Sequence, residues 1–279
     1  MDGPAIIARS MSLPFTKDVR GRAWQYHSRS DRHSKIACWA IMFDLLRECP
    51  LLAGHVERSV VGFGINHEMR EFTTNRKKNL DLVICTPREG QGEPLPGKAF
   101  AELVSAYGVA LSDDEMASLR SLPPFLQRPT GSVRVALEAK AAMTAHIRAI
   151  PRLFDELNSS HLTIHASSDV ALAGGFVMIN TAAEFISPDL NKSTTPGPDV
   201  VSANQPHGAE RVLEKIQQIP RRARAGQDGF DAFGVLLISM RNDGGPVTVV
   251  PGPDNGGAVF RYEQMVRRLA QLYEARYNA

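Results

Sequence analysis

The stretch that decides the fold is residues 133–142, which read Val-Arg-Val-Ala-Leu-Glu-Ala-Lys-Ala-Ala. Apolar residues recur at every second position from Val133 to Leu137, which is the period of a strand with one buried face. Because successive strand side chains point to opposite faces, Glu138 and Lys140 share the face opposite those apolar residues. The stretch therefore predicts a core strand that ends with a carboxylate beside an ammonium group.

A second strand is predicted at residues 79–86, Asn-Leu-Asp-Leu-Val-Ile-Cys-Thr, just before Pro87. Its alternation places Leu80, Leu82 and Ile84 on one face. Asp81 is the one charged residue in this apolar run, and a buried carboxylate is costly unless it meets a cation or hydrogen-bond donors. Asp81 therefore needs a partner elsewhere in the chain.

Length and composition describe an ordinary globular chain of 279 residues, with 43% hydrophobic and 22% charged residues. No apolar run reaches the roughly 18 residues that a membrane span needs, and no signal-peptide pattern opens the sequence. The three cysteines are odd in number and widely spaced, which favours a reducing environment over a disulfide framework. We therefore expect a cytoplasmic protein.

The net charge of +2 neither demands nor excludes a nucleic-acid partner, so local clusters matter more. A cluster of this kind is more often a solvated surface than a phosphate site. Three basic clusters stand out: Arg20, Arg22, Arg29 and Arg32; Arg76, Lys77 and Lys78; and Arg221, Arg222 and Arg224.

The order of predicted elements indicates an α/β fold, in which helices flank a central mixed β-sheet. Residues 1–33 lack a clear period and are predicted to form an irregular N-terminal arm, followed by a single domain at 34–279. Residues 87–131 are predicted to be a helical insertion, too long for an ordinary connection. The remaining predictions are helices at 35–48, 99–109, 112–122, 152–159, 209–219 and 258–277, and strands at 55–64, 69–73, 175–185 and 232–240.

Two interpretations of the charged strand residues stay open. In the structural one, Glu138 and Lys140 form an ion pair at an exposed strand end, while Asp81 caps a turn or pairs with Arg134. In the functional one, Asp81 and Glu138 lie on neighbouring strands around a divalent cation, because carboxylate oxygens are the ligands that magnesium prefers. Lys140 would then offset phosphate charge and help to activate a water molecule.

The pattern of Asp81 followed by Glu138-Ala139-Lys140 resembles the PD-(D/E)XK nuclease superfamily, the restriction-endonuclease-like fold. The resemblance covers roughly residues 34–185. It implies magnesium-dependent cleavage of double-stranded DNA, with manganese able to substitute, and commonly a homodimer. The positions matching Asp81 and Glu138 would bind the metal together with the backbone carbonyl of Ala139, and the position matching Lys140 would assist the water.

The sequence departs from the family pattern in two ways. Asp81 follows Leu80, so the Pro-Asp pair of the family is absent. The gap between Asp81 and Glu138 is longer than usual, so the first acid could instead be Asp113 or Asp114. The sequence Ser112–Glu115 matches a capping box, however, and that role already explains both aspartates. Some members of the family add an acid from the first helix, and Asp44 and Glu48 are the candidates.

The polar segment 146–165 is predicted to line a phosphate-binding edge next to Lys140, through Arg152, Asp155, Glu156, Ser159, Ser160, His161 and His165. Together these features predict a DNA endonuclease of restriction or other antiphage defence. The alternative is a catalytically inactive member of the same fold that binds nucleic acid or a protein.

Overall fold

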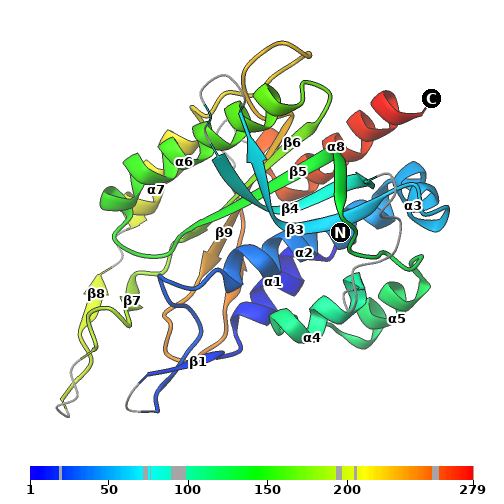
Figure 1. Cartoon of the computed structure of the whole chain (residues 1–279). Helices are drawn as coiled ribbons and strands as arrows, with labels where there is room; N and C mark the ends of the chain where they lie inside the picture. Colours follow the sequence, from blue (N-terminus) through cyan, green and yellow to red (C-terminus); the bar gives the residue numbers. More distant parts are fainter. Residues whose placement is uncertain are drawn as a thin grey trace.

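The computed structural model describes residues 1–18, 21–71, 75, 77–88, 99–192, 197–203, 206–252 and 258–278. At its centre lies a six-stranded mixed sheet (Figure 1), so the predicted α/β fold with a central mixed sheet is confirmed. The strand order is β10 (Thr248–Val250), β9 (Ala232–Ser239), β6 (Leu172–Asn180), β5 (Thr130–Ala142), β4 (Lys77–Pro87) and β3 (Gly62–Arg70). The pairs β3–β4, β4–β5 and β9–β10 are antiparallel, whereas β5–β6 and β6–β9 are parallel.

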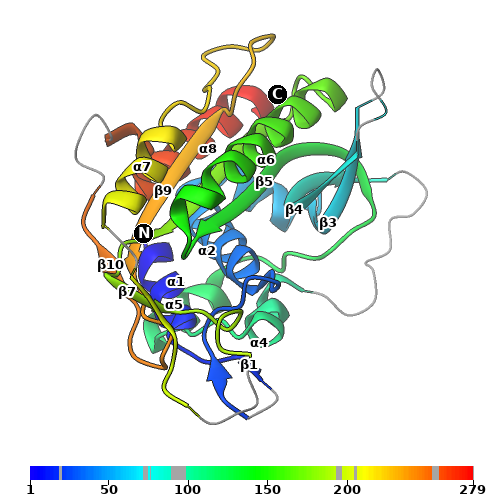
Figure 2. The same cartoon turned by 90° about the vertical axis from the view of Figure 1, so that its left-hand side faces the viewer.

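Helices cover both faces of this sheet (Figure 2). One face packs against α1 (Gly3–Met11), α2 (Arg32–Glu48), α3 (Pro50–Glu57) and α8 (Tyr262–Tyr277). The opposite face packs against α6 (His146–Ser167) and α7 (Pro206–Ile216). Strand β5 shows why both layers are needed: Val135 and Leu137 belong to the core on the α2 side, and Ala136 belongs to the core on the α6 side.

The described part of the predicted insertion folds against α2. It comprises η1 (Phe100–Glu102), α4 (Leu103–Tyr107) and α5 (Asp113–Ser121). The ring of Trp39 stacks on that of Phe100 at 4.9 Å between centroids, and its indole N–H donates to the Phe100 carbonyl. The predicted capping box is present at the start of α5. Residues 89–98 lie outside the described residues.

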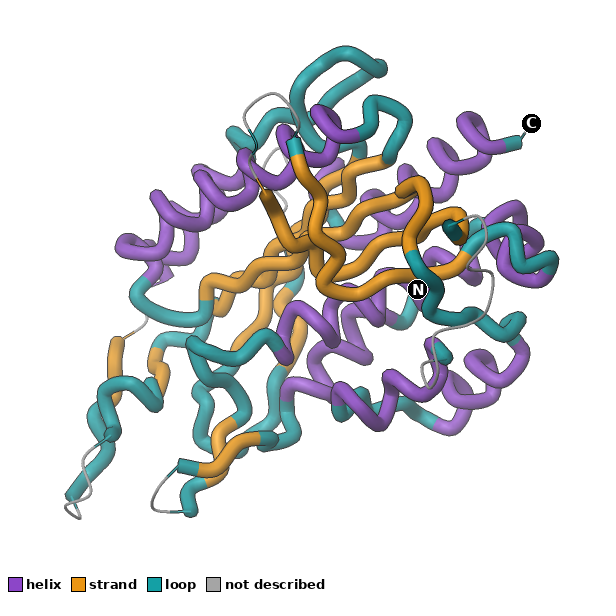
Figure 3. Tube along the Cα trace, in the orientation of Figure 1, coloured by secondary structure: helices purple, strands orange, loops and turns teal. Residues whose placement is uncertain are grey.

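Two short strand pairs project from the same end of the molecule (Figure 3). One pair is β1 (Thr16–Lys17) with β2 (Ala23–Trp24), and the other is β7 (Glu184–Ile186) with β8 (Val201–Ala203). An ion pair between Arg22 and Asp199 joins the two projections. A last short helix, η2 (Ala258–Phe260), precedes α8.

Several predicted elements were wrong or displaced. The N-terminal segment 1–33 is not irregular throughout, because its residues Gly3–Met11 form helix α1, whose apolar side chains are buried in the core. The segment predicted as a strand at 55–64 instead contains the end of α3 and the start of β3. Strand β3 runs on to Arg70, so the strands predicted at 55–64 and 69–73 are not two separate strands. Helix α6 starts before Pro151, which lies within it.

The basic clusters are also different from the prediction. Arg222 is only 2% exposed and pairs with Asp231, and Arg32 is buried and donates to backbone carbonyls. Neither side chain is part of a solvated or phosphate-binding surface, while Arg20 and Arg76 lie outside the described residues.

None of the helices in the described ranges has the length and apolar character needed to cross a membrane.

Candidate functional site

The candidate site lies where strands β4 and β5 separate. Their ladder ends at the pair Leu82 and Leu137, beyond which β5 continues beside β6 and β4 continues beside β3. Asp81 and Glu138 are the first residues past this fork. The Asp81 side chain replaces the missing strand partner, because its Oδ2 accepts a hydrogen bond of 2.9 Å from the Ala139 backbone N–H.

The alternation of β4 is interrupted at Asp81. Leu80 packs in the core beside α6, whereas Leu82 and Ile84 pack in the core beside α2, so the prediction of one shared face was wrong for Leu80. Asn66 on the adjacent strand has a φ of 50°, in the left-handed region. The Asp81 Oδ1 accepts from the Ser34 hydroxyl at 3.3 Å, which ties the carboxylate to the first turn of α2.

Glu138 is buried, with 1% of its surface exposed. Its Oε1 lies 2.7 Å from the Lys140 ammonium and 3.7 Å from that of Lys78, so the carboxylate is paired with two cations. These are ion pairs rather than aligned hydrogen bonds: among the described residues, neither carboxylate oxygen has a hydrogen-bond donor in suitable geometry. A buried carboxylate in this state retains lone pairs for a further ligand.

The surroundings of the fork raise the pKa values of Asp81 and Lys140. Burial raises the pKa of Asp81 to about 6, and the negative charge of Glu138 adds to this rise. Burial alone would lower the pKa of Lys140, but the nearby Glu138 carboxylate outweighs burial and the pKa is raised. The lysine is therefore held as an ammonium, and Asp81 takes up a proton closer to neutral pH than an ordinary aspartate does.

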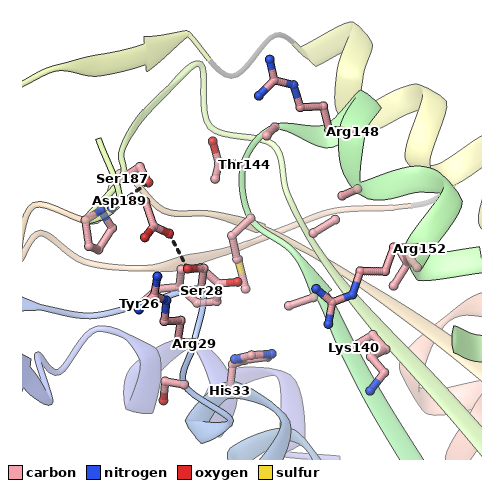
Figure 4. A pocket seen from close by; sticks show the side chains of 18 of the residues that line it. Tyr26, Ser28, Arg29, His33, Lys140, Thr144, Arg148, Arg152, Ser187 and Asp189 are labelled. Atoms are coloured by element: carbon pink, nitrogen blue, oxygen red, sulfur yellow. Dashed lines mark hydrogen bonds between the residues drawn. The ribbon is translucent and has the colours of Figure 1, made fainter. Parts of the chain in front are cut away.

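A cleft of about 1050 Å³ opens over this fork (Figure 4). Asp81, Ala139 and Lys140 line it, whereas Glu138 is buried and does not. Helix α6 forms one wall with Arg148, Arg152 and Glu156, so the predicted position next to Lys140 is confirmed for Arg152 and Glu156. The prediction was wrong for the other members of the segment, which do not line this cleft: Asp155, Ser159, Ser160, His161 and His165. The other wall comes from residues 26–34 and 187–190.

A hard divalent cation fits the donor set. In the described part of the chain, no group of three or more His, Cys, Asp or Glu side chains could hold a metal ion. Magnesium does not need one, since it keeps several waters and is commonly held by one or two carboxylates. A cation would also relieve the repulsion between Asp81 and Glu138 and use the oxygens of Glu138 that lack donors.

The other candidate acids have structural roles. Asp44 is 1% exposed and accepts hydrogen bonds from the backbone of Gly3 and the hydroxyl of Tyr262. Glu48 pairs with Arg267 at 3.6 Å, and neither acid lines the cleft. Asp113 and Asp114 occupy the first turn of α5, also away from the cleft.

The structural interpretation made from the sequence is partly confirmed, and of the functional one only the placement of Asp81 and Glu138 on neighbouring strands is confirmed. Glu138 and Lys140 do form an ion pair, but Glu138 is buried rather than exposed. Asp81 caps the free edge of β5 instead of a turn, while Arg134 contacts Tyr273 and Tyr277. Sequence reasoning missed Lys78 as a partner of Glu138, and it missed the wall formed by residues 26–34 and 187–190.

Comparisons with known proteins add no identification: no family model, no curated protein and no solved structure matches this chain.

Proposed function

We propose that this chain is a magnesium-dependent DNA endonuclease with the restriction-endonuclease-like fold. The observation that carries the proposal is the meeting of Asp81, Glu138 and Lys140 at the fork between β4 and β5, under a large cleft. Asp81 precedes Glu138 by 57 positions and Lys140 by 59 positions, so strand pairing rather than sequence brings it close to them. If these charged residues formed only a solvated surface, Glu138 would not be buried at the fork.

Each residue has a definite role in this proposal. The carboxylates of Asp81 and Glu138, with the Ala139 carbonyl, would hold magnesium or manganese. When bound, the metal supplies a Lewis acid that stabilises negative charge on a phosphate group. Lys140, held as an ammonium by Glu138, provides a positive charge in the cleft and can donate a hydrogen bond to a water or a phosphate oxygen.

The proposed substrate is double-stranded DNA, and the proposed setting is restriction or another form of antiphage defence in the cytoplasm. A homodimer would allow two such sites to cut both strands. These parts of the proposal rest on the resemblance of the Asp81, Glu138 and Lys140 pattern to the nuclease superfamily.

The test is cleavage of supercoiled plasmid DNA with magnesium and with a chelator. Glu138→Ala and Lys140→Ala should both abolish nicking and cutting while DNA binding remains. The matched control is Asp155→Asn, which changes an exposed carboxylate on α6 and should leave cleavage intact. Full activity of either site variant would refute the assignment.

A second candidate function, a non-catalytic binding protein of the same fold, is favoured by one observation. Lys140 and Lys78 already neutralise Glu138, so the carboxylate is compensated without a metal. Calorimetric titration with manganese separates the two candidates. A nuclease should bind manganese and lose this binding in Glu138→Gln, whereas a non-catalytic protein should show no such binding.

A further inference from the structure

The acidic side chains of the cleft all have ion-pair or hydrogen-bond partners, whereas two of its basic side chains have none among the described residues. Its lining has four acidic and four basic side chains: Asp31, Asp81, Glu156 and Asp189, with Arg29, Lys140, Arg148 and Arg152. Pairing within this set would leave the cleft neutral. The observed contacts are different, because two of the acids pair with lysines that do not line the cleft.

All four acids have partners. Asp31 pairs with Lys35 at 2.8 Å, and Asp189 pairs with Lys192 at 2.8 Å. Asp81 accepts from the Ala139 backbone. The fourth acid, Glu156, lies 2.6 Å from the Arg152 guanidinium and 3.7 Å from the Lys140 ammonium.

The remaining cations, Arg29 and Arg148, have no side-chain hydrogen bond or ion pair with any described residue. Both are exposed, and they lie on opposite walls of the cleft (Figure 4). Arg148 is in the first turn of α6, one helical turn before Arg152, so both arginines are on the same side of that helix. The cleft therefore has two guanidinium groups available for an anion.

The wall that carries Arg29 is held in place by side-chain contacts. The Asn242 Oδ1 accepts from the Gln25 and Tyr26 backbone N–H groups at 3.1 and 2.9 Å. A hydrogen bond between the Ser28 hydroxyl and Asp189 connects this wall to the segment that follows β7. The backbone next to Arg29 is therefore held in position by hydrogen bonds to other segments.

We infer that Arg29 and Arg148 bind phosphate groups on either side of the phosphate that lies at Lys140. The inference rests on the proposed function and specifies how its DNA substrate is held. Guanidinium groups suit phosphate because they donate in a planar fork, and such contacts fix register without reading sequence. The ligand is an extended polyanion, since the cleft of about 1050 Å³ exceeds most small-molecule pockets and the two free cations lie on separate walls.

Salt-dependent binding tests this inference without catalysis. A fluorescent 20-base-pair duplex is titrated with protein in chelator, across a series of salt concentrations. Each phosphate contact contributes about 0.9 to the slope of log affinity against log salt. Arg29→Ala and Arg148→Ala should each reduce the slope by about one, and the double variant by about two. The control is Arg120→Ala, an exposed arginine on α5 outside the cleft, which should leave the slope unchanged.

Cleavage assays then separate substrate holding from chemistry. With magnesium, Arg29→Ala and Arg148→Ala should raise KM for duplex DNA several-fold, yet hydrolyse bis(4-nitrophenyl) phosphate as the wild type does. Lys140→Met should lose both activities.

The two proposals fail in different ways. An unchanged salt slope in the double variant, or no DNA binding by the wild type, overturns the phosphate contacts. If the slope falls as expected but no DNA is cut, the contacts are upheld and the nuclease assignment fails.

Discussion

Replacing Asp81 with asparagine should stabilise the protein at neutral pH, although it should destroy the proposed activity. The reason is the cost of ionising a buried carboxyl group that also lies near the negative charge of Glu138. The pKa of Asp81 is raised from an ordinary 3.8 to about 6 by burial and by Glu138. Between these two values the folded protein binds more protons than the unfolded chain, so the free energy of unfolding falls as pH rises.

The magnitude follows from the two pKa values. Each pKa unit corresponds to 1.36 kcal/mol, so ionisation of Asp81 costs the fold about 3 kcal/mol, and about 2 kcal/mol after allowance for its partial exposure. The stabilising contribution of protonated Asp81 is fully present below pH 4 and lost as pH rises through about 6. Asparagine keeps an oxygen that can accept from the Ala139 N–H, and it has no charge to lose.

The assay is urea denaturation of wild type and Asp81→Asn in chelator, at a series of pH values from 4 to 8. The variant should match the wild type near pH 4 and exceed its free energy of unfolding by about 2 kcal/mol at pH 7.5. Magnesium should narrow this gap by stabilising only the wild type. The exposed control Asp155→Asn should follow the wild-type curve. If Asp81→Asn is no more stable than this control at pH 7.5, the electrostatic reasoning is wrong.

Three further predictions concern the contacts that support the site and the fold. Glu138→Gln removes the charge that holds Lys140 as an ammonium, so the pKa of Lys140 should fall, as measured by NMR of its side chain; an unchanged pKa would contradict the coupling. Arg222→Met should cost about 3–5 kcal/mol in urea denaturation because it leaves buried Asp231 without its 2.8 Å partner, and adding Asp231→Asn should recover part of that loss. Trp39→Ala should cost about 3–5 kcal/mol and increase hydrogen exchange in α4 and α5, since it removes the stack on Phe100; exchange confined to α2 would argue against this anchoring role.

The strands and helices with a clear period could be predicted from the sequence. Strand β5 and helix α2 lie close to their expected positions because apolar residues recur in their sequences at strand and helix spacing. The structure buries more than these patterns predict, because both faces of β5 and the whole run of α2 from Ile36 to Leu46 are buried. Helix α3 was missed because its valine and the following valines suggested a strand. The physical signal for a helix was Pro50 at its first position, where a proline needs no backbone donor, and Cys49 before it, whose sulfur accepts from the Leu52 N–H.

The site could be predicted only at Asp81, where no neighbour in the sequence explains the presence of a charged residue. Asp81 stood out because a charge in an apolar strand requires a partner. Arg222 and Arg32 misled for the opposite reason: local charge counts suggested solvated clusters, whereas the partners of these residues are Asp231 and backbone carbonyls of distant segments. The cleft wall that carries Arg29 was not predictable, because the side chain of Asn242 holds it from more than two hundred residues away.

The long gap between Asp81 and Glu138 was the weakest step of the prediction. Strand pairing explains why the gap does not keep the two acids apart. Pro87 pairs with Thr130, so both ends of the insertion meet at the ladder that continues to Leu82 and Leu137. Closing a longer loop costs little, since each doubling of its length adds about 0.6 kcal/mol. The described part of the insertion also buries aromatic rings against α2. The relative position of the two acids is therefore fixed by strand register, which is independent of the number of residues between them.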